Sequence, residues 1–465
     1  MYEIDQLLKE VKHIHFIGIG GSGMCPLAEI LNEKGYIISG SDNNETDTLA
    51  RVRAMGAKVT LGQVPENIEG AELIIYTSAI LAGNPELEAA KNSGIPLFER
   101  NDLLGAITRI YPDCIGVCGT HGKTTTCAML TQVLIECGKD PSAVIGGKLP
   151  LTGTSGIVGS SEHMVCESCE YQDHFLKLTP DVAVILNVDE DHLEYFKNLD
   201  NLKKSFEKFA SFATKKIIYN GDDKNTCDVI ESVKVISDKP TVSFGFNKTN
   251  DYYADNIELK NEFASFDVIY KDENLGRVTL SIPGEHNIYN ALAVFASAVH
   301  TGAQPAEIIT AIAHFRGAGR RFEILDVIDG ITIADDYAHH PRELEVTLNT
   351  AMGMGYNNVW AVFQPFTYSR TKILFDDFVR VLKIPDKVVM TEIMGSREVN
   401  TYGIYTADLA KEIPGSVWYN TFEEVSQYVV DHAKEGDFVI TLGCGDIYKA
   451  AKIMIKMLKE KRKEG

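Results

Sequence analysis

The residues best suited to chemistry lie in one short segment, residues 119–126, which reads GTHGKTTT. An apolar run at 114–118 predicts a strand before it, and the pattern at 127–135 predicts a helix after it. A strand that turns at glycines and continues as a helix directs unpaired backbone N–H groups at one point. Phosphate oxygens suit that point, Lys123 adds a mobile positive charge, and Thr124 offers a hydroxyl to Mg²⁺. The segment therefore predicts a site for a nucleoside triphosphate.

This segment is a variant of the P-loop. The strict pattern, G-x-x-x-x-G-K-[ST], requires glycine at position 117, where this chain has Val117. We interpret Gly116 and Gly119 as the residues that supply the turn instead. The alternative is an ordinary strand–helix turn with an exposed lysine, but the strand, the glycines, the Lys-Thr pair and the helix all occur in the expected order.

A second glycine-rich turn lies near the N-terminus, between a predicted strand at residues 12–17 and a helical pattern at 24–31. Its G-x-G-x-x-G spacing in that context predicts a pyrophosphate site at a helix N-terminus. The next predicted strand, 36–39, ends close to Asp42, where a ribose-binding acid is expected. Taken alone, the pattern fits a nicotinamide-dependent dehydrogenase, but it fits a UDP-linked ligand as well.

Polar residues follow two further predicted strands. Glu167 comes directly after the strand at 163–166, and His192 ends the NVDEDH segment that follows the strand at 182–186. Ligands of open α/β sheets bind at the carboxyl ends of strands, so both side chains are expected beside the P-loop. Glu167 offers the oxygen that Mg²⁺ prefers, and His192 suits a second metal or a phosphate. The alternative for each residue alone is a solvated loop position.

The remaining patterns place polar residues at the starts of helices and the ends of strands. Alternating segments within 240–282 predict antiparallel strands packed against the central unit. Asn287 and Asn290, three apart at the start of a helical pattern, are expected to point the same way. A last unit begins after the short glycine-containing segment 315–319. Its motifs DDYAHHP and QPFTYSR follow predicted strands. We do not expect the adjacent histidines of the first motif to bind a metal together.

Length and composition predict a globular protein of about three domains, at roughly 150 residues each. The chain has 465 residues, of which 45% are apolar and 24% charged. We predict an α/β fold with three domains. They are a Rossmann-like domain at 1–107, a central P-loop ATPase-like domain at 108–318 and a C-terminal Rossmann-like domain at 319–465.

The charge balance excludes some partners. Forty-five basic and 65 acidic residues give a net charge of −20, which argues against a nucleic-acid partner. No apolar run approaches the roughly 18 residues of a membrane span, and the first residues do not resemble a signal peptide, so a cytoplasmic protein without a membrane partner is expected. The nine scattered cysteines do not suggest a disulfide framework. We interpret Cys166 and Cys169 as small apolar residues at a strand end.

The motifs, taken in order, resemble those of the Mur ligases, which build the peptidoglycan precursor, over nearly the whole chain. They are GIGGSGM, GTHGKTTT, the ExxEY stretch after residue 166, NVDEDH, PGEHNIYNA, GRRFE, DDYAHHP and GCGDIY. The resemblance implies an ATP- and Mg²⁺-dependent ligase, a monomer or homodimer, that joins L-alanine to the carboxylate of UDP-N-acetylmuramate through an acyl phosphate. The alternative within the family is the recycling ligase, which adds a preformed peptide to the same nucleotide sugar.

The resemblance also implies roles for individual residues. The UDP-sugar would be held by Gly18, Gly20, Gly21, Gly23, Ser41, Asp42 and Ser78. ATP would be held by Gly119, Thr120, His121, Gly122, Lys123, Thr124, Thr125, Asn287 and Asn290, with Arg321 and Asp336 from the third domain. The metal would be held by Thr124, Glu167 and His192. The amino acid would be held by Tyr337, His339 and Arg370. The catalytic residues would be Lys123, Glu167, His192, Arg321 and Asp336.

This chain departs from the family pattern at two places. Many relatives carry E-A-D-E-S-D where this chain has Glu167 and the residues after it, but Glu167 itself is kept. Relatives often read Q-P-H-R-Y-[ST]-R where this chain has Phe366 and Thr367. These two residues replace a His and an Arg that suit the carboxylate of the amino acid, and Arg370 remains. The resemblance therefore leaves alanine, glycine and serine open as the amino acid.

Overall fold

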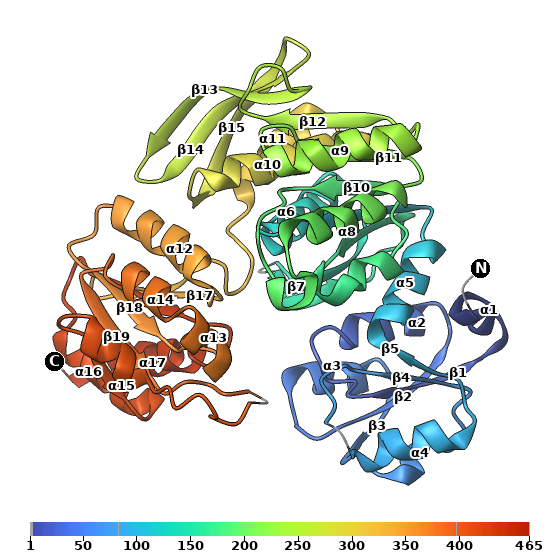
Figure 1. The fold of residues 1–465 in the computed structure, drawn as a ribbon, viewed down its shortest axis with the longest axis horizontal. Helices are drawn as coiled ribbons and strands as arrows, with labels where there is room; N and C mark the ends of the chain where they lie inside the picture. The colour runs from blue at the N-terminus through green and yellow to red at the C-terminus, as the bar shows by residue number, and fades with distance from the viewer. Residues whose placement is uncertain (1–2, 82, 150, 397, 465) are drawn as a thin grey trace. The chain divides into compact units, whose positions relative to one another are not determined.

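The protein has the predicted mixed α/β architecture, built on three largely parallel sheets (Figure 1). The computed structural model describes residues 3–81, 83–149, 151–396 and 398–464. The chain divides into two compact units. The first takes in the chain up to Glu258 with Ser265–Leu280 and His286–Phe315, and the second takes in Leu259–Ala264, Ser281–Glu285 and the chain from Arg316.

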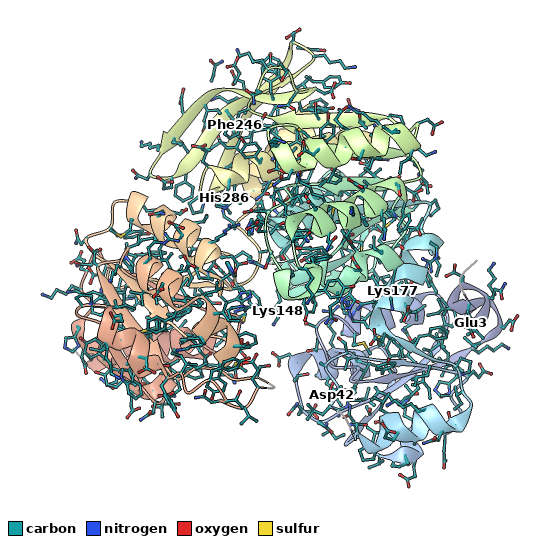
Figure 2. All side chains as sticks on the ribbon, viewed as in Figure 1. Glu3, Asp42, Lys148, Lys177, Phe246 and His286 are labelled. Atoms are coloured by element: carbon teal, nitrogen blue, oxygen red, sulfur yellow. The ribbon has the colours of Figure 1, made fainter. Side chains whose placement is uncertain are left out.

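The N-terminal part of the first unit is a doubly wound parallel sheet of five strands. In their order across the sheet, the strands are β3 (Lys58–Leu61), β2 (Ile37–Asp42), β1 (His13–Ile17), β4 (Leu73–Tyr76) and β5 (Leu97–Glu99). The helices are α1 (Glu3–Glu10), α2 (Cys25–Glu33), α3 (Asp47–Ala54), α4 (Pro85–Ser93) and α5 (Arg100–Ile110). The strand order reverses between β1 and β4, so the carboxyl ends of these strands open a crevice for a ligand. Asp42 ends β2 at this edge (Figure 2).

The rest of the first unit is organised on a sheet of ten strands. In order, the strands are β15 (Glu273–Pro283), β14 (Phe263–Tyr270), β13 (Tyr252–Lys260), β12 (Thr241–Gly245), β11 (Lys216–Asn220), β10 (Val182–Ile185), β6 (Asp113–Cys118), β9 (His163–Glu167), β7 (Ser142–Leu149) and β8 (Thr154–Ile157). The helices are α6 (Lys123–Glu136), α7 (Leu193–Phe196), α8 (Leu199–Ser211), α9 (Lys224–Ile236), α10 (His286–His300) and α11 (Pro305–His314). All six residues of β6 are buried, and it pairs in parallel with β10 and β9, so their polar carboxyl ends share one edge.

The turn between β6 and α6 differs from its predicted form in one residue. Gly116 lies inside β6, where an added Cβ would come within 2.9 Å of Pro180 Cβ and 3.0 Å of Ser168 Oγ. Its missing side chain therefore serves packing against the strand, and the interpretation of Gly116 as a turn residue was wrong. The left-handed backbone is supplied by Gly119, at φ +142°, and by Gly122, at φ +86°.

The part of the second unit that follows Arg316 is organised on a sheet of six strands. In order, they are β16 (Glu323–Ile328), β17 (Ile331–Asp336), β21 (Phe438–Leu442), β18 (Val359–Phe363), β19 (Lys387–Thr391) and β20 (Val417–Tyr419). The helices are α12 (Pro341–Gly353), α13 (Tyr368–Ile373), α14 (Phe375–Val381), α15 (Thr406–Glu412), α16 (Phe422–His432) and α17 (Tyr448–Glu464). The strands are parallel except β16, which runs antiparallel to β17.

Both faces of this six-stranded sheet are covered, as expected for a doubly wound fold. Along β18, Ala361 and Phe363 pack into one apolar core, and Trp360 and Val362 pack into the other. Because β21 lies between β17 and β18, the motifs that follow these three strands meet at one edge. In the part of the chain that the structure describes, no helix is both long and apolar enough to cross a membrane.

Candidate active site

The P-loop lysine is held by its own loop and by one carboxylate. Lys123 is the first residue of α6, and its Nζ donates to the carbonyl oxygens of Gly119 (2.5 Å) and Thr120 (3.1 Å) and to Oε1 of Glu170 (2.9 Å). Burial works against the charge, but the nearby Glu170 carboxylate overcomes it and holds the pKa of Lys123 above its usual value. Lys123 is therefore a fixed cation at the loop.

The segment after β10 fixes the shape of the P-loop. The Thr120 N–H donates to the carbonyl of Asn187, whose side-chain oxygen accepts from the His121 N–H at 2.8 Å. The Asn187 amide nitrogen donates back to the His121 carbonyl at 3.1 Å, and the Thr120 hydroxyl bonds the backbone of Asp189. The structure thus joins GTHGKTTT and NVDEDH, which lie about 66 positions apart in the chain, as the strand-end rule predicted.

Two of the predicted metal ligands touch each other. The Thr124 hydroxyl donates to Oε1 of Glu167 at 3.0 Å, and Oε2 of Glu167 accepts from the Gly146 N–H at 2.6 Å. Glu167 ends β9, the strand beside β6, which is why its carboxylate reaches the first turn of α6. A hydroxyl and a carboxylate at this point form a hard oxygen site next to the loop.

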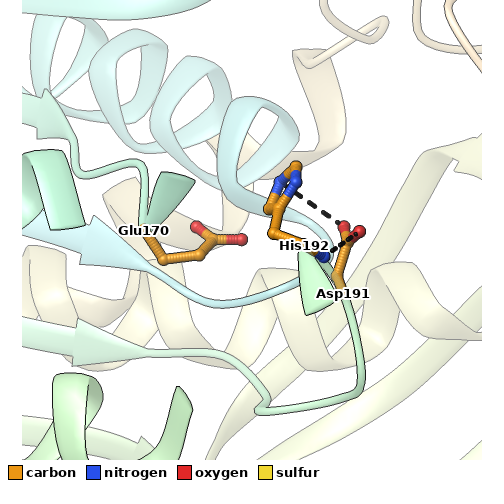
Figure 3. Close-up of side chains that lie close together, drawn as sticks. All are labelled: Glu170, Asp191 and His192. Atoms are coloured by element: carbon orange, nitrogen blue, oxygen red, sulfur yellow. Dashed lines mark hydrogen bonds and ion pairs between the residues drawn. The ribbon is translucent and has the colours of Figure 1, made fainter. Parts of the chain in front are cut away.

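The third predicted metal ligand, His192, lies in a different group. Its ligand atoms and those of Glu170 and Asp191 are within 4.8 Å of one another (Figure 3). The Glu170 side chain is 1% exposed, and its Oε2 has no hydrogen-bond partner among the described residues. His192 has a left-handed backbone, at φ +52°, which is uncommon for residues other than glycine and tends to occur at functional sites. The set predicted as Thr124, Glu167 and His192 is therefore divided between two neighbouring places.

Sequence reasoning missed Glu170 and Asp191 as members of this group. Asp191 stands next to His192, so the acid-rich NVDEDH segment already contained a signal. Glu170 is the second acid of the ExxE stretch, and its role depends on a turn that includes left-handed Gln172 and Asp173. Of the neighbouring cysteines, Cys166 is buried as interpreted, whereas Cys169 is exposed.

The two asparagines at the start of α10 point the same way, as predicted, and are also hydrogen-bonded to each other. Asn290 donates through Nδ2 to Oδ1 of Asn287 at 2.8 Å, and its own Oδ1 accepts from the Thr126 hydroxyl at 3.2 Å. Both side chains are buried. A Cβ at Gly122 would come within 2.5 Å of Asn290 Oδ1, so the P-loop backbone passes directly over this amide.

We expect Gly122→Ala to weaken ATP binding at least about tenfold, a change of about 1.4 kcal/mol. Alanine is strained at φ +86°, and its methyl group would displace Asn290 from the loop. Gly138→Ala is the matched control, because Gly138 also has a left-handed backbone but no heavy atom within 4 Å of its Cβ position. Calorimetric titration with ATP measures both variants, and an equal loss in both would contradict the expectation.

The glycine turn near the N-terminus, residues 18–23 between β1 and α2, is here called the first glycine turn. The end of β2 holds it in place through hydrogen bonds. The Ser41 carbonyl accepts from the N–H groups of Gly18 (2.8 Å) and Ile19 (3.0 Å), and the Asp42 carboxylate accepts from the Gly20 N–H at 3.0 Å. The Ser41 hydroxyl is buried and donates to Glu86 rather than facing the crevice. Both predicted ligand residues therefore shape the turn.

Other residues border this turn, including one that the sequence did not reveal. A Cβ at Gly23 would come within 3.2 Å of Nη1 of Arg100, the first residue of α5. Burial lowers the pKa of Arg100, although acidic groups, Glu167 among them, oppose the shift. Arg100 thus places a positive charge beside Gly23, the third glycine of the G-x-G-x-x-G pattern. Ser78 follows β4, next to Thr77, whose methyl group lies against Gly18.

In the second unit, the predicted residues gather at the carboxyl ends of β17 and β18. Asp336 accepts from the N–H groups of Phe322 and Ala338, both at 2.6 Å. Burial raises the pKa of Asp336 to about 6, and Arg321 opposes that shift. The Arg321 guanidinium lies 5.3 Å from the centre of the Tyr337 ring.

The QPFTYSR segment completes this cluster. The Phe366 ring lies edge-on to His339, with centroids 6.3 Å apart, and His339 is 5.6 Å from Tyr337. Nη1 of Arg370 is buried without a hydrogen-bond partner among the described residues. A buried guanidinium nitrogen of this kind suits a ligand carboxylate.

Comparisons with known proteins identify one family along the chain. Its domain models match in order: "Mur ligase family, catalytic domain" at residues 13–111, "Mur ligase middle domain" at 117–298 and "Mur ligase, glutamate ligase domain" at 320–445. The UDP-N-acetylmuramate–L-alanine ligase of Caldanaerobacter subterraneus is 41% identical over 99% of this chain and 100% of its own length. That of Alkaliphilus metalliredigens is 39% identical over 96% and 97%. The crystal structure of UDP-N-acetylmuramate-alanine ligase MurC from Thermotoga maritima matches with a TM-score of 0.81, at 26% identity over 97% and 99%.

Proposed function

Because this chain belongs to the Mur ligase family, we infer that it is an ATP-dependent ligase that joins L-alanine to the carboxylate of UDP-N-acetylmuramate in peptidoglycan precursor synthesis. The observation that carries this function is the P-loop edge, where Lys123 and the Thr124–Glu167 pair face one point. Such an edge serves phosphoryl transfer, which the nicotinamide-dehydrogenase hypothesis does not require. That hypothesis is set aside.

The chemistry explains why a ligase needs this edge. A carboxylate is a poor electrophile, so the muramoyl carboxylate oxygen first attacks the γ-phosphorus of ATP, and ADP leaves. The amine of alanine then attacks the acyl phosphate, loses a proton, and the tetrahedral intermediate expels inorganic phosphate to leave the amide. In the first step two anions meet, and at ~4 Å their repulsion is about 4 kcal/mol at an effective dielectric of 20. Lys123, fixed as a cation by Glu170, opposes that repulsion.

Mg²⁺ fits the residues present. Thr124 and Glu167 offer hard oxygens beside the loop, and the buried Oε2 of Glu170 lacks a hydrogen-bond partner among the described residues. We propose that Thr124 and Glu167 hold one ion and that Glu170, Asp191 and His192 hold a second. When bound, Mg²⁺ neutralises phosphate charge. Glu170 would then serve both Lys123 and a metal.

The remaining ligands are assigned to the other predicted sites. We propose that the UDP diphosphate lies on the turn from Gly18 to Gly23, with Arg100 as its positive partner. In the second unit, the unpartnered Nη1 of Arg370 supports a role in binding the amino-acid carboxylate, with Tyr337 and His339 beside it. Arg321 and Asp336 stay proposals as ATP contacts. The domain boundaries at 107 and 318, a cytoplasmic location and a monomeric or homodimeric state without nucleic-acid or membrane partners also stay proposals.

Phosphate release tests the function directly. Purified protein with ATP, Mg²⁺ and UDP-N-acetylmuramate is expected to release phosphate with L-alanine and to form the amide product in equal amount. Glycine and L-serine are included because Phe366 and Thr367 depart from the family pattern. A tripeptide tests the recycling alternative. Release with the tripeptide and not with L-alanine would reverse the assignment within the family.

A further inference from the structure

A buried hydrogen-bonded chain lies beneath the first glycine turn. Glu86, on α4, accepts from Nε2 of His15 (2.7 Å) through one oxygen and from the Ser41 hydroxyl (2.6 Å) through the other. Nδ1 of His15 contacts the Ser39 hydroxyl at 2.8 Å, and that hydroxyl contacts Nε2 of His13 at 2.7 Å. Two adjacent strands and a helix are thus joined through polar side chains.

This hydrogen-bonded network of polar side chains is costly to bury. Glu86 and Ser41 are fully buried, His15 is 2% exposed, and the same strand places Ile14 and Phe16 in an apolar core. Replacing a buried ionic group with apolar side chains of similar volume is often neutral or stabilising, so fold stability alone does not account for Glu86. A role at the neighbouring ligand site accounts for it better.

The group that Glu86 controls is the glycine turn. Its partner Ser41 uses the side chain toward Glu86 and the backbone carbonyl toward the N–H groups of Gly18 and Ile19. Ser41 therefore links α4 to the first residues of the glycine turn, so a shift of α4 would move Gly18 and Ile19. We propose that Glu86 is a positioning residue that sets the glycine turn for the diphosphate of the nucleotide sugar without touching it. The proposal rests on the proposed function, because it assigns that ligand to this turn.

Counting hydrogens shows what the hydrogen bonds of this network require. The Gly70 carbonyl can only accept, so Nδ1 of His13, 2.7 Å away, must donate to it. The Ser39 hydroxyl has one hydrogen and faces two imidazole nitrogens, so one of those nitrogens donates. The bond between His15 and Glu86 needs one more hydrogen. The hydrogen bonds of this network thus need one hydrogen more than two neutral imidazoles and a carboxylate carry.

The test compares variants of the full-length protein in binding and in turnover. Glu86→Met keeps the side-chain length but breaks both bonds, and it is expected to raise the KM for UDP-N-acetylmuramate and the Kd for UDP at least about tenfold. The kcat at saturating sugar and the KM for ATP should stay within about twofold. Glu86→Gln keeps one acceptor, for the Ser41 hydroxyl, and replaces the other with a donor toward His15, whose Nε2 accepts in its other tautomer, so it should recover most of the affinity. Glu88→Met is the control, because Glu88 lies on α4 but is half exposed, and its carboxylate pairs with Lys91 on the same helix.

A purely structural role would lower the melting temperature and the active fraction of Glu86→Met while leaving its KM and Kd unchanged, and that result would overturn the proposal. If Glu86→Met does not fold, Ser41→Ala removes the same bond from the other side and is expected to show the same loss of UDP affinity. An unchanged affinity in Ser41→Ala would also overturn it. Wild-type protein that binds UDP but releases no phosphate contradicts the proposed function alone, and loss of UDP affinity in Glu86→Met would still support the positioning role.

Discussion

Replacing Lys123 with methionine is expected to reduce phosphate release at least about 10³-fold while the affinity for UDP-N-acetylmuramate changes less than about threefold. The lysine supplies the positive charge where the muramoyl carboxylate meets the triphosphate, and methionine keeps the aliphatic stem without that charge. The first glycine turn belongs to a different sheet, so its diphosphate contacts remain. Single-turnover phosphate release and calorimetric titration with the nucleotide sugar measure the two quantities.

The control for this variant follows from Glu170. Without Lys123, the Glu170 carboxylate stays buried with no cation, which destabilises a protein by about 3–5 kcal/mol. The double variant Lys123→Met with Glu170→Gln removes that unpaired charge, so it should regain melting temperature but not activity. Recovery of activity in the double variant would show that Lys123 acts only as a counterion and that Glu170 is not an essential ligand of the metal. Loss of sugar binding in the single variant would mean that the two nucleotide sites were assigned in the wrong order.

Much of this site could be predicted because helix and sheet geometry fix short spacings and strand ends. The pairing of Asn287 with Asn290 follows from three residues of helix, and the structure places their amides 2.8 Å apart. The contact between Thr124 and Glu167 follows from the carboxyl ends of adjacent parallel strands, which meet at one edge.

The remainder depends on where individual side chains turn, which no spacing rule determines. Glu170 reaches Lys123 only through the irregular segment after β9. Gly116 fits the glycine pattern of a turn equally well whether it lies in the turn or inside β6, and its pairing with β9 and β10 in the folded sheet decides between them. Arg100 reaches Gly23 across 77 positions of sequence, a contact that a single sequence does not reveal.

Replacing Glu167 with glutamine is expected to lower kcat at least about 100-fold and to remove most of the effect of Mg²⁺ on ATP affinity. The amide oxygen still accepts from the Thr124 hydroxyl, so the contact with the loop is kept, although the amide nitrogen cannot accept from the Gly146 N–H. The negative charge that attracts the metal is gone. Without Mg²⁺, the expected effect of the substitution on ATP affinity reverses. The carboxylate repels the triphosphate, so the variant should bind metal-free ATP as tightly as the wild type or more tightly.

The Glu167 variant therefore separates a metal ligand from a residue that only shapes the loop. A loop-shaping residue would weaken ATP binding equally with and without Mg²⁺, whereas loss of a metal ligand weakens only the binding that Mg²⁺ assists. Glu162→Gln is the matched control, because Glu162 is an exposed acid just before the opposite end of β9 and should leave both affinities unchanged. Calorimetric titration with ATP, in Mg²⁺ and in a chelator, measures the ratio of the two ATP affinities for each variant. If Mg²⁺ improves the affinity of the Glu167 variant as much as that of the wild type, Glu167 is not a ligand of the metal, and the assignment then passes to the group of Glu170, Asp191 and His192.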